Sequence, residues 1–189
     1  MKVIQLRGTN ATGKTTTIRQ FISKGDFVVK SIDMGARDVE YHWDDSRKIL
    51  VLGRYDQAMS GGIDGYITNK DFLRDVIVRI IKRIKPNVLL FEGIVYGVTF
   101  KFAYELSRYL EQNDIDYIGV CLNPPLDVVF ERLAERNDGK AVDYMSVQNK
   151  WFTANRAYEK LRKSGINVKE IDTTNVPKNQ MYKIIEDLL

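Results

Sequence analysis

A glycine-rich segment near the N-terminus has the spacing of a phosphate-binding loop. It runs Gly8-Thr-Asn-Ala-Thr-Gly-Lys-Thr15 and matches the pattern G-x-x-x-x-G-K-[ST]. Glycines let successive backbone N–H groups curl around an anion, and the following helix presents its positive N-terminus to the same phosphates. In this pattern the lysine, Lys14, reaches the β- and γ-phosphates of ATP, and the hydroxyl of Thr15 holds Mg²⁺. The segment therefore predicts a site for ATP and Mg²⁺.

The elements around this loop are those that such a loop needs. An apolar run at residues 3–6 predicts a strand before it, and residues 14–22 predict a helix after it. Thr16 commonly touches the α-phosphate in loops of this kind. A weaker expectation places adenine against residues 172–175. The predicted ATP-binding residues are Gly8, Asn10, Ala11, Thr12, Gly13, Lys14, Thr15 and Thr16.

Two acids at the ends of predicted strands are candidates for the chemistry. Asp33 follows the predicted strand 27–32, and Glu92 closes the fully apolar run 88–91. A charge that closes an apolar strand is costly unless it meets a partner. The layout around Asp33 resembles that of small kinases that act on hydroxyls, including the polynucleotide kinases, and this resemblance implies that an acid at its place accepts the proton of the attacking hydroxyl. Asp33 is therefore expected as the general base and Glu92 as the acid that orients Mg²⁺, although either could activate the acceptor.

Two arginines on one predicted helix are candidates for stabilising the transferred phosphoryl group. Arg132 and Arg136 are four residues apart and share a helix face, just before the polar stretch 137–143. Cations aimed at the γ-phosphate oxygens stabilise the transition state of phosphoryl transfer. The alternative is a solvated helix face on which Glu131 and Glu135 form local ion pairs.

A glycine-rich stretch at residues 53–68 combines residue types that bind nucleic acid. Arg54 could hold a phosphate, Tyr55 could stack on a base, and Asp64 could accept a hydrogen bond from a hydroxyl. Glycines in such a stretch let the backbone approach a ligand closely. A plain connecting loop is the alternative interpretation.

The order of the elements predicts an α/β fold. Apolar strands alternate with helices, which favours a parallel sheet covered on both faces. The predicted helices after the first lie at residues 71–85, 100–112, 125–135 and 145–163, and Pro177 begins the last one. Further strands are predicted at 117–122 and 166–171. Residues 39–43 and 48–52 predict a small antiparallel insertion. With 189 residues and no repeat or linker, the chain should form a single domain over residues 1–189.

Composition excludes several classes of protein. One cysteine and one histidine allow neither a disulfide framework nor a zinc site. No segment reaches the roughly 18 apolar residues of a membrane span. No signal peptide is visible, so a cytoplasmic protein without membrane contact is expected. The 29 basic residues against 25 acidic ones permit a polyanionic partner without requiring one.

The size and layout of the chain resemble the small nucleoside and nucleotide kinases. This resemblance implies a P-loop kinase fold with a parallel five-stranded core sheet and a mobile, Arg-rich lid carrying Arg132 and Arg136. A GTPase would usually show an N-K-x-D motif, which the chain lacks. Helicases and AAA-type motors usually end a strand in paired Asp-Glu, whereas Phe91-Glu92-Gly93 contains a single acid.

Several short motifs resemble more narrowly the phage 5-hydroxymethyluracil DNA kinases. These are the G-x-Y of residues 53–55, the Gly-Gly-x-Asp that ends at Asp64, Phe91-Glu92-Gly93, the opening Leu6-Arg-Gly-Thr9, and residues 122–132 and 149–163. The family often has a cysteine before the two glycines, where this chain has Ser60. The resemblance implies that ATP phosphorylates the exocyclic hydroxyl of a hydroxymethylated pyrimidine in DNA, in the cytoplasm of the host cell if the protein is phage-encoded.

Other functions remain open on the sequence. A deoxynucleoside monophosphate kinase or a polynucleotide 5′-hydroxyl kinase would share the phosphate loop and the lid, so the acceptor is DNA or a nucleotide. A nucleotide-dependent regulatory ATPase would need no acceptor. The basic stretch 149–163 suits a DNA strand, although its aromatic residues also fit an ordinary core stripe. No protein partner can be inferred.

Overall fold

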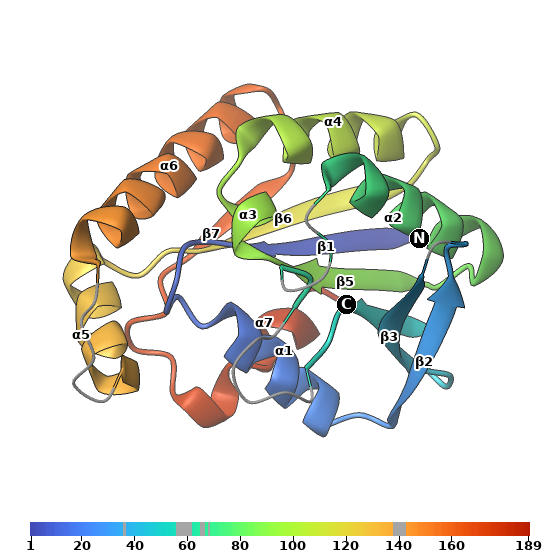
Figure 1. Cartoon of the computed structure of the whole chain (residues 1–189), viewed down its shortest axis with the longest axis horizontal. Helices are drawn as coiled ribbons and strands as arrows, with labels where there is room; N and C mark the ends of the chain where they lie inside the picture. The colour runs from blue at the N-terminus through green and yellow to red at the C-terminus, as the bar shows by residue number, and fades with distance from the viewer. Residues whose placement is uncertain (36, 56–61, 65–66, 68, 138–142) are drawn as a thin grey trace.

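A seven-stranded sheet lies at the centre of the computed structural model, which describes residues 1–35, 37–55, 62–64, 67, 69–137 and 143–189 (Figure 1). The order of its strands is β2-β3-β4-β5-β1-β6-β7. They span β1 Lys2–Arg7, β2 Phe27–Asp33, β3 Asp38–Asp44, β4 Ile49–Leu52, β5 Val88–Glu92, β6 Asp116–Leu122 and β7 Val168–Ile171.

The neighbours from β4 to β7 pair in parallel, whereas β3 pairs antiparallel with both β2 and β4. The sequence predicted a parallel five-stranded core with a small antiparallel insertion. In the structure the parallel strands β4, β5, β1, β6 and β7 continue through the antiparallel β3 and β2 as one seven-stranded sheet. Because only four residues separate β2 from β3, these strands pair antiparallel; a parallel pair needs a connection of a dozen or more residues. The β2 strand also exposes most of its residues, as an edge strand can.

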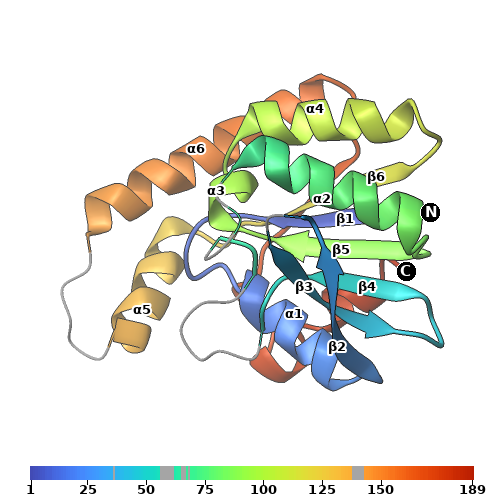
Figure 2. The same ribbon diagram turned by 45° about the vertical axis from the view of Figure 1, so that its right-hand side comes forward.

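Helices cover the sheet on both faces (Figures 1 and 2). One face packs against α2 (Lys70–Arg83), α4 (Phe100–Glu111) and the end of α6 (Tyr144–Lys163), and the other against α1 (Lys14–Ser23) and α7 (Lys183–Glu186). The short α3 (Ile94–Gly97) follows β5, and α5 (Leu126–Asn137) follows β6. The predicted last helix is instead a 3₁₀ turn at Lys178–Gln180 followed by α7.

Two separate cores result from the alternation of side chains along the strands. In β1, Val3 points into the core beneath α2 and α4, while Ile4 and Leu6 point into the core beneath α1 and α7. All five residues of β5 are buried, as expected for a parallel strand covered on both sides. The central strands β5 and β1 are therefore rigid supports for whatever lies at their carboxyl ends.

Among the described residues, no helix has the length and apolar composition needed to cross a membrane.

Candidate functional site

The phosphate loop connects the central strand β1 to α1, as predicted. Gly8 has φ +132°, and a Cβ atom there would lie 2.5 Å from the backbone oxygen of Leu122 on the neighbouring strand. Only glycine fits that backbone, which starts the turn around the loop. Thr12 donates a hydrogen bond from its hydroxyl to the Thr9 carbonyl at 3.1 Å, which closes the loop from inside.

Lys14 lies inside the curl of this loop. Its ammonium donates a hydrogen bond to the Thr9 carbonyl at 2.6 Å, and only 5% of the residue is exposed. Burial lowers the pKa of Lys14, while the nearby charges of Glu92 and Asp64 oppose that shift. Two of the three ammonium hydrogens remain for other acceptors. A polyanion in the loop would supply such acceptors and favour the charged amine.

Glu92 meets Thr15 at the carboxyl end of β5. The Thr15 hydroxyl donates a hydrogen bond to the Glu92 Oε1 atom at 2.7 Å, and Glu92 is almost completely buried. Burial raises the pKa of Glu92, against the opposing effect of Lys14. A hydroxyl that donates its hydrogen keeps its lone pairs for a cation, and hard oxygen ligands are those that Mg²⁺ prefers. The pair is thus chemically suited to a magnesium ion held jointly with phosphate oxygens.

Gly62 brings the middle stretch of the chain against Glu92. Gly62 and Arg54 exchange backbone hydrogen bonds of 3.0 and 3.1 Å, and Ile63 N donates to the Glu92 carbonyl at 3.2 Å. A Cβ atom on Gly62 would lie 2.6 Å from Glu92 Oε1, and its φ of +84° is one that other residues rarely adopt. The backbone at Gly62 therefore forms one wall around the Glu92 carboxylate.

Gly62→Ala should destabilise the protein and impair any activity that needs Glu92. The matched control is Gly165→Ala, because Gly165 has a similar φ of +73° with nothing within 4 Å of its missing Cβ. Backbone strain should cost each variant roughly 1–2 kcal/mol, and overpacking should add about 1–3 kcal/mol for Gly62→Ala alone. Chemical denaturation of both variants measures the difference. Equal losses would show that the contact with Glu92 imposes no constraint.

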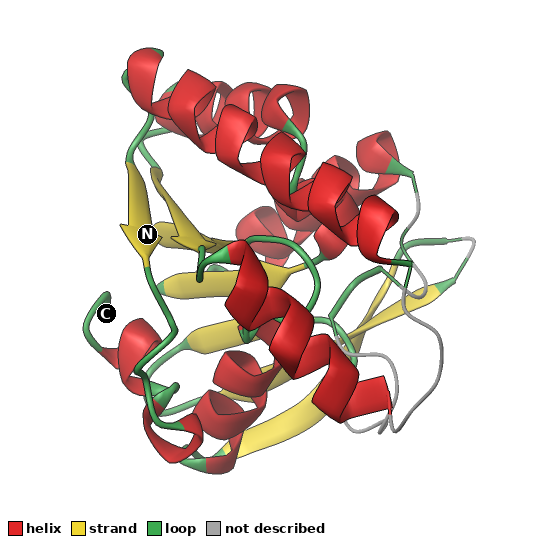
Figure 3. Cartoon of the chain, turned by 90° about the vertical axis from the view of Figure 1, so that its left-hand side faces the viewer, coloured by secondary structure: helices red, strands yellow, loops and turns green. Residues whose placement is uncertain are grey.

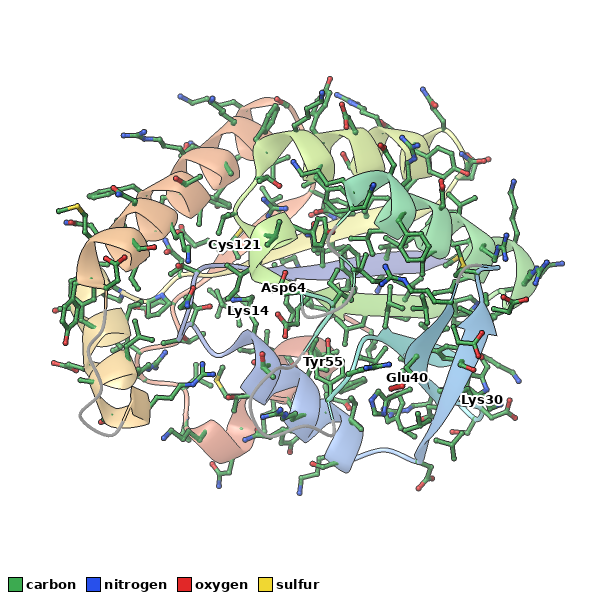
Figure 4. All side chains as sticks on the ribbon, in the orientation of Figure 1. Lys14, Lys30, Glu40, Tyr55, Asp64 and Cys121 are labelled. Carbon is green, nitrogen blue, oxygen red and sulfur yellow. The ribbon has the colours of Figure 1, made fainter. Side chains whose placement is uncertain are left out.

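Asp64 lines the same cleft as Lys14. Its carboxylate accepts hydrogen bonds from the backbone N–H groups of Ile94 and Val95, the latter at 3.2 Å, at the start of α3. Figure 4 shows Asp64 and Lys14 close together at the carboxyl ends of the central strands. A carboxylate offers about four acceptor positions, so Asp64 retains capacity for a further donor.

Arg7, at the end of β1, holds α3 in place. It is 1% exposed and donates hydrogen bonds to the carbonyls of Tyr96 and Thr99 at 3.3 and 3.0 Å. Because α3 binds Asp64 at its other end, Arg7 connects the strand beneath the phosphate loop to the acid across the cleft. The sequence offers little sign of this role, since a cation that ends a strand usually faces solvent.

The other two predicted acceptor residues lie elsewhere. Arg54 forms an ion pair with Glu40 on β3 at 3.0 Å. Tyr55 is 6% exposed and packs in the core beneath α1, with its ring 5.7 Å from that of His42. In this position Tyr55 cannot stack on a base, which corrects the expectation for its side chain. Figure 4 shows Glu40 and Tyr55 apart from the phosphate loop.

Asp33 is also placed away from the cleft. It ends β2, the edge strand, which is four strand positions from β1 and so roughly 19 Å away. Its Oδ1 atom accepts a hydrogen bond from the backbone N–H of Gly35 at 2.6 Å, which is the arrangement of a turn cap. The structure therefore does not bring Asp33 together with Lys14, because β2 lies at the edge of the sheet rather than in its parallel centre.

Arg132 and Arg136 both line the cleft from α5, as their spacing predicts. Arg132 donates hydrogen bonds to the Thr173 carbonyl at 2.6 Å and to its hydroxyl oxygen at 3.0 Å. Thr173 in turn donates to the Thr12 carbonyl at 3.1 Å. Arg132 is thus tied to the phosphate loop through the segment after β7. Arg136 is exposed, and its charge contributes to the lowered pKa of Lys14. Residues 138–142 of the polar stretch that follows α5, and Ser60, lie outside the described residues.

Together these groups enclose a cleft of about 620 Å³. From the predicted loop, the lining includes Asn10, Ala11, Gly13, Lys14, Thr15 and Thr16. Arg19, Ile94, Glu135, Val176, Lys178 and Met181 line it without having been predicted. The place of Arg19 in the cleft could have been predicted, because Arg19 follows Thr15 by one turn of the same helix. Val176, Lys178 and Met181 come just after the segment 172–175 that was expected near adenine, and no local pattern marks them.

Comparison with known proteins adds sequence relatives from phages. The chain is 30% identical over 156 residues to the 5-hmdU DNA kinase of Delftia phage PhiW-14, a match that covers 78% of this chain and 58% of that protein. It is 29% identical over 199 residues to the 5-hmdU DNA kinase of Pseudomonas phage M6, and this match covers the full length of both. No protein-family model matches the chain.

Solved structures share the fold. The crystal structure of a fungal RNA kinase superposes with a TM-score of 0.57 over 99% of this chain and 43% of that one, at 11% identity. Such low identity carries information on the fold alone. The phage relatives and this shared fold agree with the resemblance to P-loop kinases and support a P-loop phosphotransferase.

Proposed function

We propose that this P-loop kinase transfers the γ-phosphoryl group of ATP to the 5-hydroxymethyl group of a modified pyrimidine in DNA. The observation that carries the reaction type is the Thr15–Glu92 hydrogen bond beside Lys14, inside a cleft that also contains Asp64. The two phage relatives, both 5-hmdU DNA kinases, support this choice of acceptor.

In this proposal the phosphate loop holds the donor. Lys14 would contact the β- and γ-phosphates, and the Thr15 hydroxyl and Glu92 would hold Mg²⁺. When bound, the metal neutralises charge on the β- and γ-phosphate oxygens. The bond between the γ-phosphorus and the β–γ bridging oxygen breaks, a bond to the hydroxymethyl oxygen forms, and ADP leaves with the bridging oxygen. The protein contributes mainly position and charge, because the transition state is loose.

Asp64 takes the acceptor side of the cleft. Its carboxylate is held by two backbone N–H groups, so its orientation is fixed while a free acceptor position remains for the substrate hydroxyl. We assign the acceptor proton to Asp64 rather than to Asp33, because Asp64 lines the cleft. Arg136, exposed at the cleft, approaches the γ-phosphate oxygens. Arg132 donates a hydrogen bond to Thr173, which donates one to Thr12, and so Arg132 holds the segment after β7 against the phosphate loop.

The decisive experiment follows label from γ-labelled ATP with Mg²⁺ into matched acceptors. The set contains a 5′-phosphorylated oligonucleotide with one 5-hydroxymethyluracil, the same oligonucleotide with thymine, its 5′-hydroxyl form, and free deoxynucleoside monophosphates. The 5′-phosphate blocks end labelling, so we expect label only on the 5-hydroxymethyluracil oligonucleotide.

Each other result replaces the proposal with a stated alternative. Label on the 5′-hydroxyl thymine oligonucleotide would indicate a polynucleotide kinase. Label on the free monophosphates would indicate a nucleotide kinase. Phosphate release at equal rates with and without any acceptor would indicate a regulatory ATPase. The Lys14→Ala variant, run in parallel, separates this activity from that of a contaminating kinase.

A further inference from the structure

The positive charge of the chain is concentrated on one helix. The whole chain has 29 basic and 25 acidic residues, and α6 has five basic residues and one acidic. The rest of the chain therefore has 24 of each, so α6 accounts for the entire net charge of +4. A local excess of this kind produces a field that attracts polyanions.

Most of these cations are exposed and form no ion pair with a described acidic residue. Among the described residues, Lys150, Arg156, Lys160 and Lys163 form no ion pair, and only Arg162 pairs with Glu159, at 3.0 Å. On α4, by contrast, Lys101 and Arg108 each pair with a glutamate on the same helix. Exposed charges without partners keep their full attraction for an external anion.

Exposed apolar side chains stand among these cations. Phe152 is 43% exposed and Met145 is 73% exposed, and both lie on the same helix face as Arg156, because Phe152 follows Met145 by seven residues and precedes Arg156 by four. Phe152 rests with its ring edge against Trp151, at 5.3 Å between centroids. Trp151 is itself anchored by a hydrogen bond to the Pro124 carbonyl at 3.1 Å. Phe152 is therefore a supported aromatic surface open to solvent, which suits base stacking.

This face begins beside the cleft. Val147 of α6 packs against Val129 and Leu133 of α5, the helix that carries Arg136. From there α6 extends for 20 residues, or about 30 Å, to contact α4 (Figures 1 and 2). Figure 3 shows the side of the molecule that carries α5 and α6. A ligand along α6 would therefore approach the cleft at the N-terminal end of this helix.

We propose that an exposed face of α6 binds a single strand of DNA. We name this face the α6 track and define it as Met145, Phe152, Arg156, Lys160 and Lys163. The lysines and the arginine contact successive phosphates, and Phe152 stacks on a base. This inference rests on the proposed function, because the track would deliver the modified base of that strand to Asp64. Nucleic acid fits better than an acidic protein, because an exposed aromatic side chain lies among the cations.

A charge variant and a matched control test the track. The track variant carries Arg156→Gln, Lys160→Gln and Lys163→Gln. The control carries Lys82→Gln, Arg83→Gln and Lys85→Gln, which removes the same charge from exposed residues at the end of α2. Fluorescence anisotropy with an unmodified 24-nucleotide single strand is measured over a range of salt. We expect the salt slope of the track variant to fall by about two, since each phosphate contact contributes about 0.7, and that of the control to stay at the wild-type value.

A second variant tests the stacking. Phe152→Ala should weaken binding of the strand about tenfold, without changing the salt slope. Its matched control is Tyr144→Ala, another exposed aromatic residue, which should change binding less. Both variants should retain wild-type turnover on a modified trinucleotide, which is too short to lie along α6.

The outcomes separate this inference from the proposed function. Loss of strand binding in the track variant, with no transfer to 5-hydroxymethyluracil by the wild type, would keep the track and overturn the proposed function. Transfer by the wild type with equal binding by track and control variants would keep the function and overturn the track. Concentration-dependent dimers that disappear in Phe152→Ala, without a change in strand binding, would make this face a contact between copies of the chain.

Discussion

Replacing Lys14 by alanine should reduce phosphoryl transfer about a hundred- to a thousandfold, the usual effect of removing one group that stabilises developing charge. The Lys14 ammonium lies inside the loop, 2.6 Å from the Thr9 carbonyl. Among the described residues, no other lysine is buried. The loss should appear mainly in kcat, because the charge on the phosphates changes during transfer. Initial rates with the 5-hydroxymethyluracil oligonucleotide and Mg-ATP measure it.

The same variant should remain folded. Burial lowers the pKa of Lys14 below its ordinary value of 10.5, so the charged amine costs free energy in the folded state at neutral pH. The unfolded chain binds more protons between the lowered pKa and 10.5, and the stability of the wild type therefore rises with pH in that range. Lys14→Ala should lack this rise. Lys2→Ala serves as the control, since Lys2 lies at the other end of β1. Full activity of Lys14→Ala would contradict the mechanism.

Glu92→Gln should lower the transfer rate about ten- to a hundredfold and raise the Mg²⁺ concentration needed for half-maximal rate. The amide keeps an oxygen for the Thr15 hydroxyl but loses the negative charge that attracts the cation. A magnesium titration at saturating ATP measures both effects. Glu105→Gln, on the outer surface of α4, is the matched control and should behave as the wild type.

Glu92→Gln should also leave the protein as stable as the wild type, or make it more stable, at neutral pH. Burial raises the pKa of Glu92 above its ordinary value of 4.5, so the folded state binds more protons than the unfolded state between these two values. The stability of the wild type therefore falls as pH rises through this window, and the variant escapes that loss. Denaturation at a series of pH values tests the sign. A variant less stable than the wild type at pH 7 would show that the Glu92 charge supports the fold.

Local motifs correctly predicted the positions of the phosphate loop and of the two arginines on α5, whereas the positions of the predicted acceptor residues depended on contacts distant in sequence. Residues 8–15 are contiguous, so their spacing alone placed the loop between a strand and a helix. The shared face of Arg132 and Arg136 followed from the helical repeat. Asp33 was predicted as the general base, but it ends the edge strand β2, away from the cleft, because strand order depends on pairing between distant segments. The burial of Tyr55 could not be read from its neighbours in sequence, because the core that buries it is assembled from α1, β4 and α7.

The hydrogen bonds that join Thr173 to Thr12 and to Arg132 determine when the site can form during translation. Residues 8–15 are synthesised long before Thr173, Val176 and Met181, which complete the wall that faces them. A nascent chain that has emerged only as far as β6 already possesses the phosphate loop but lacks that wall. Nucleotide should therefore give little help to folding during translation, and tight binding should arise only after the segment that follows β7 has docked.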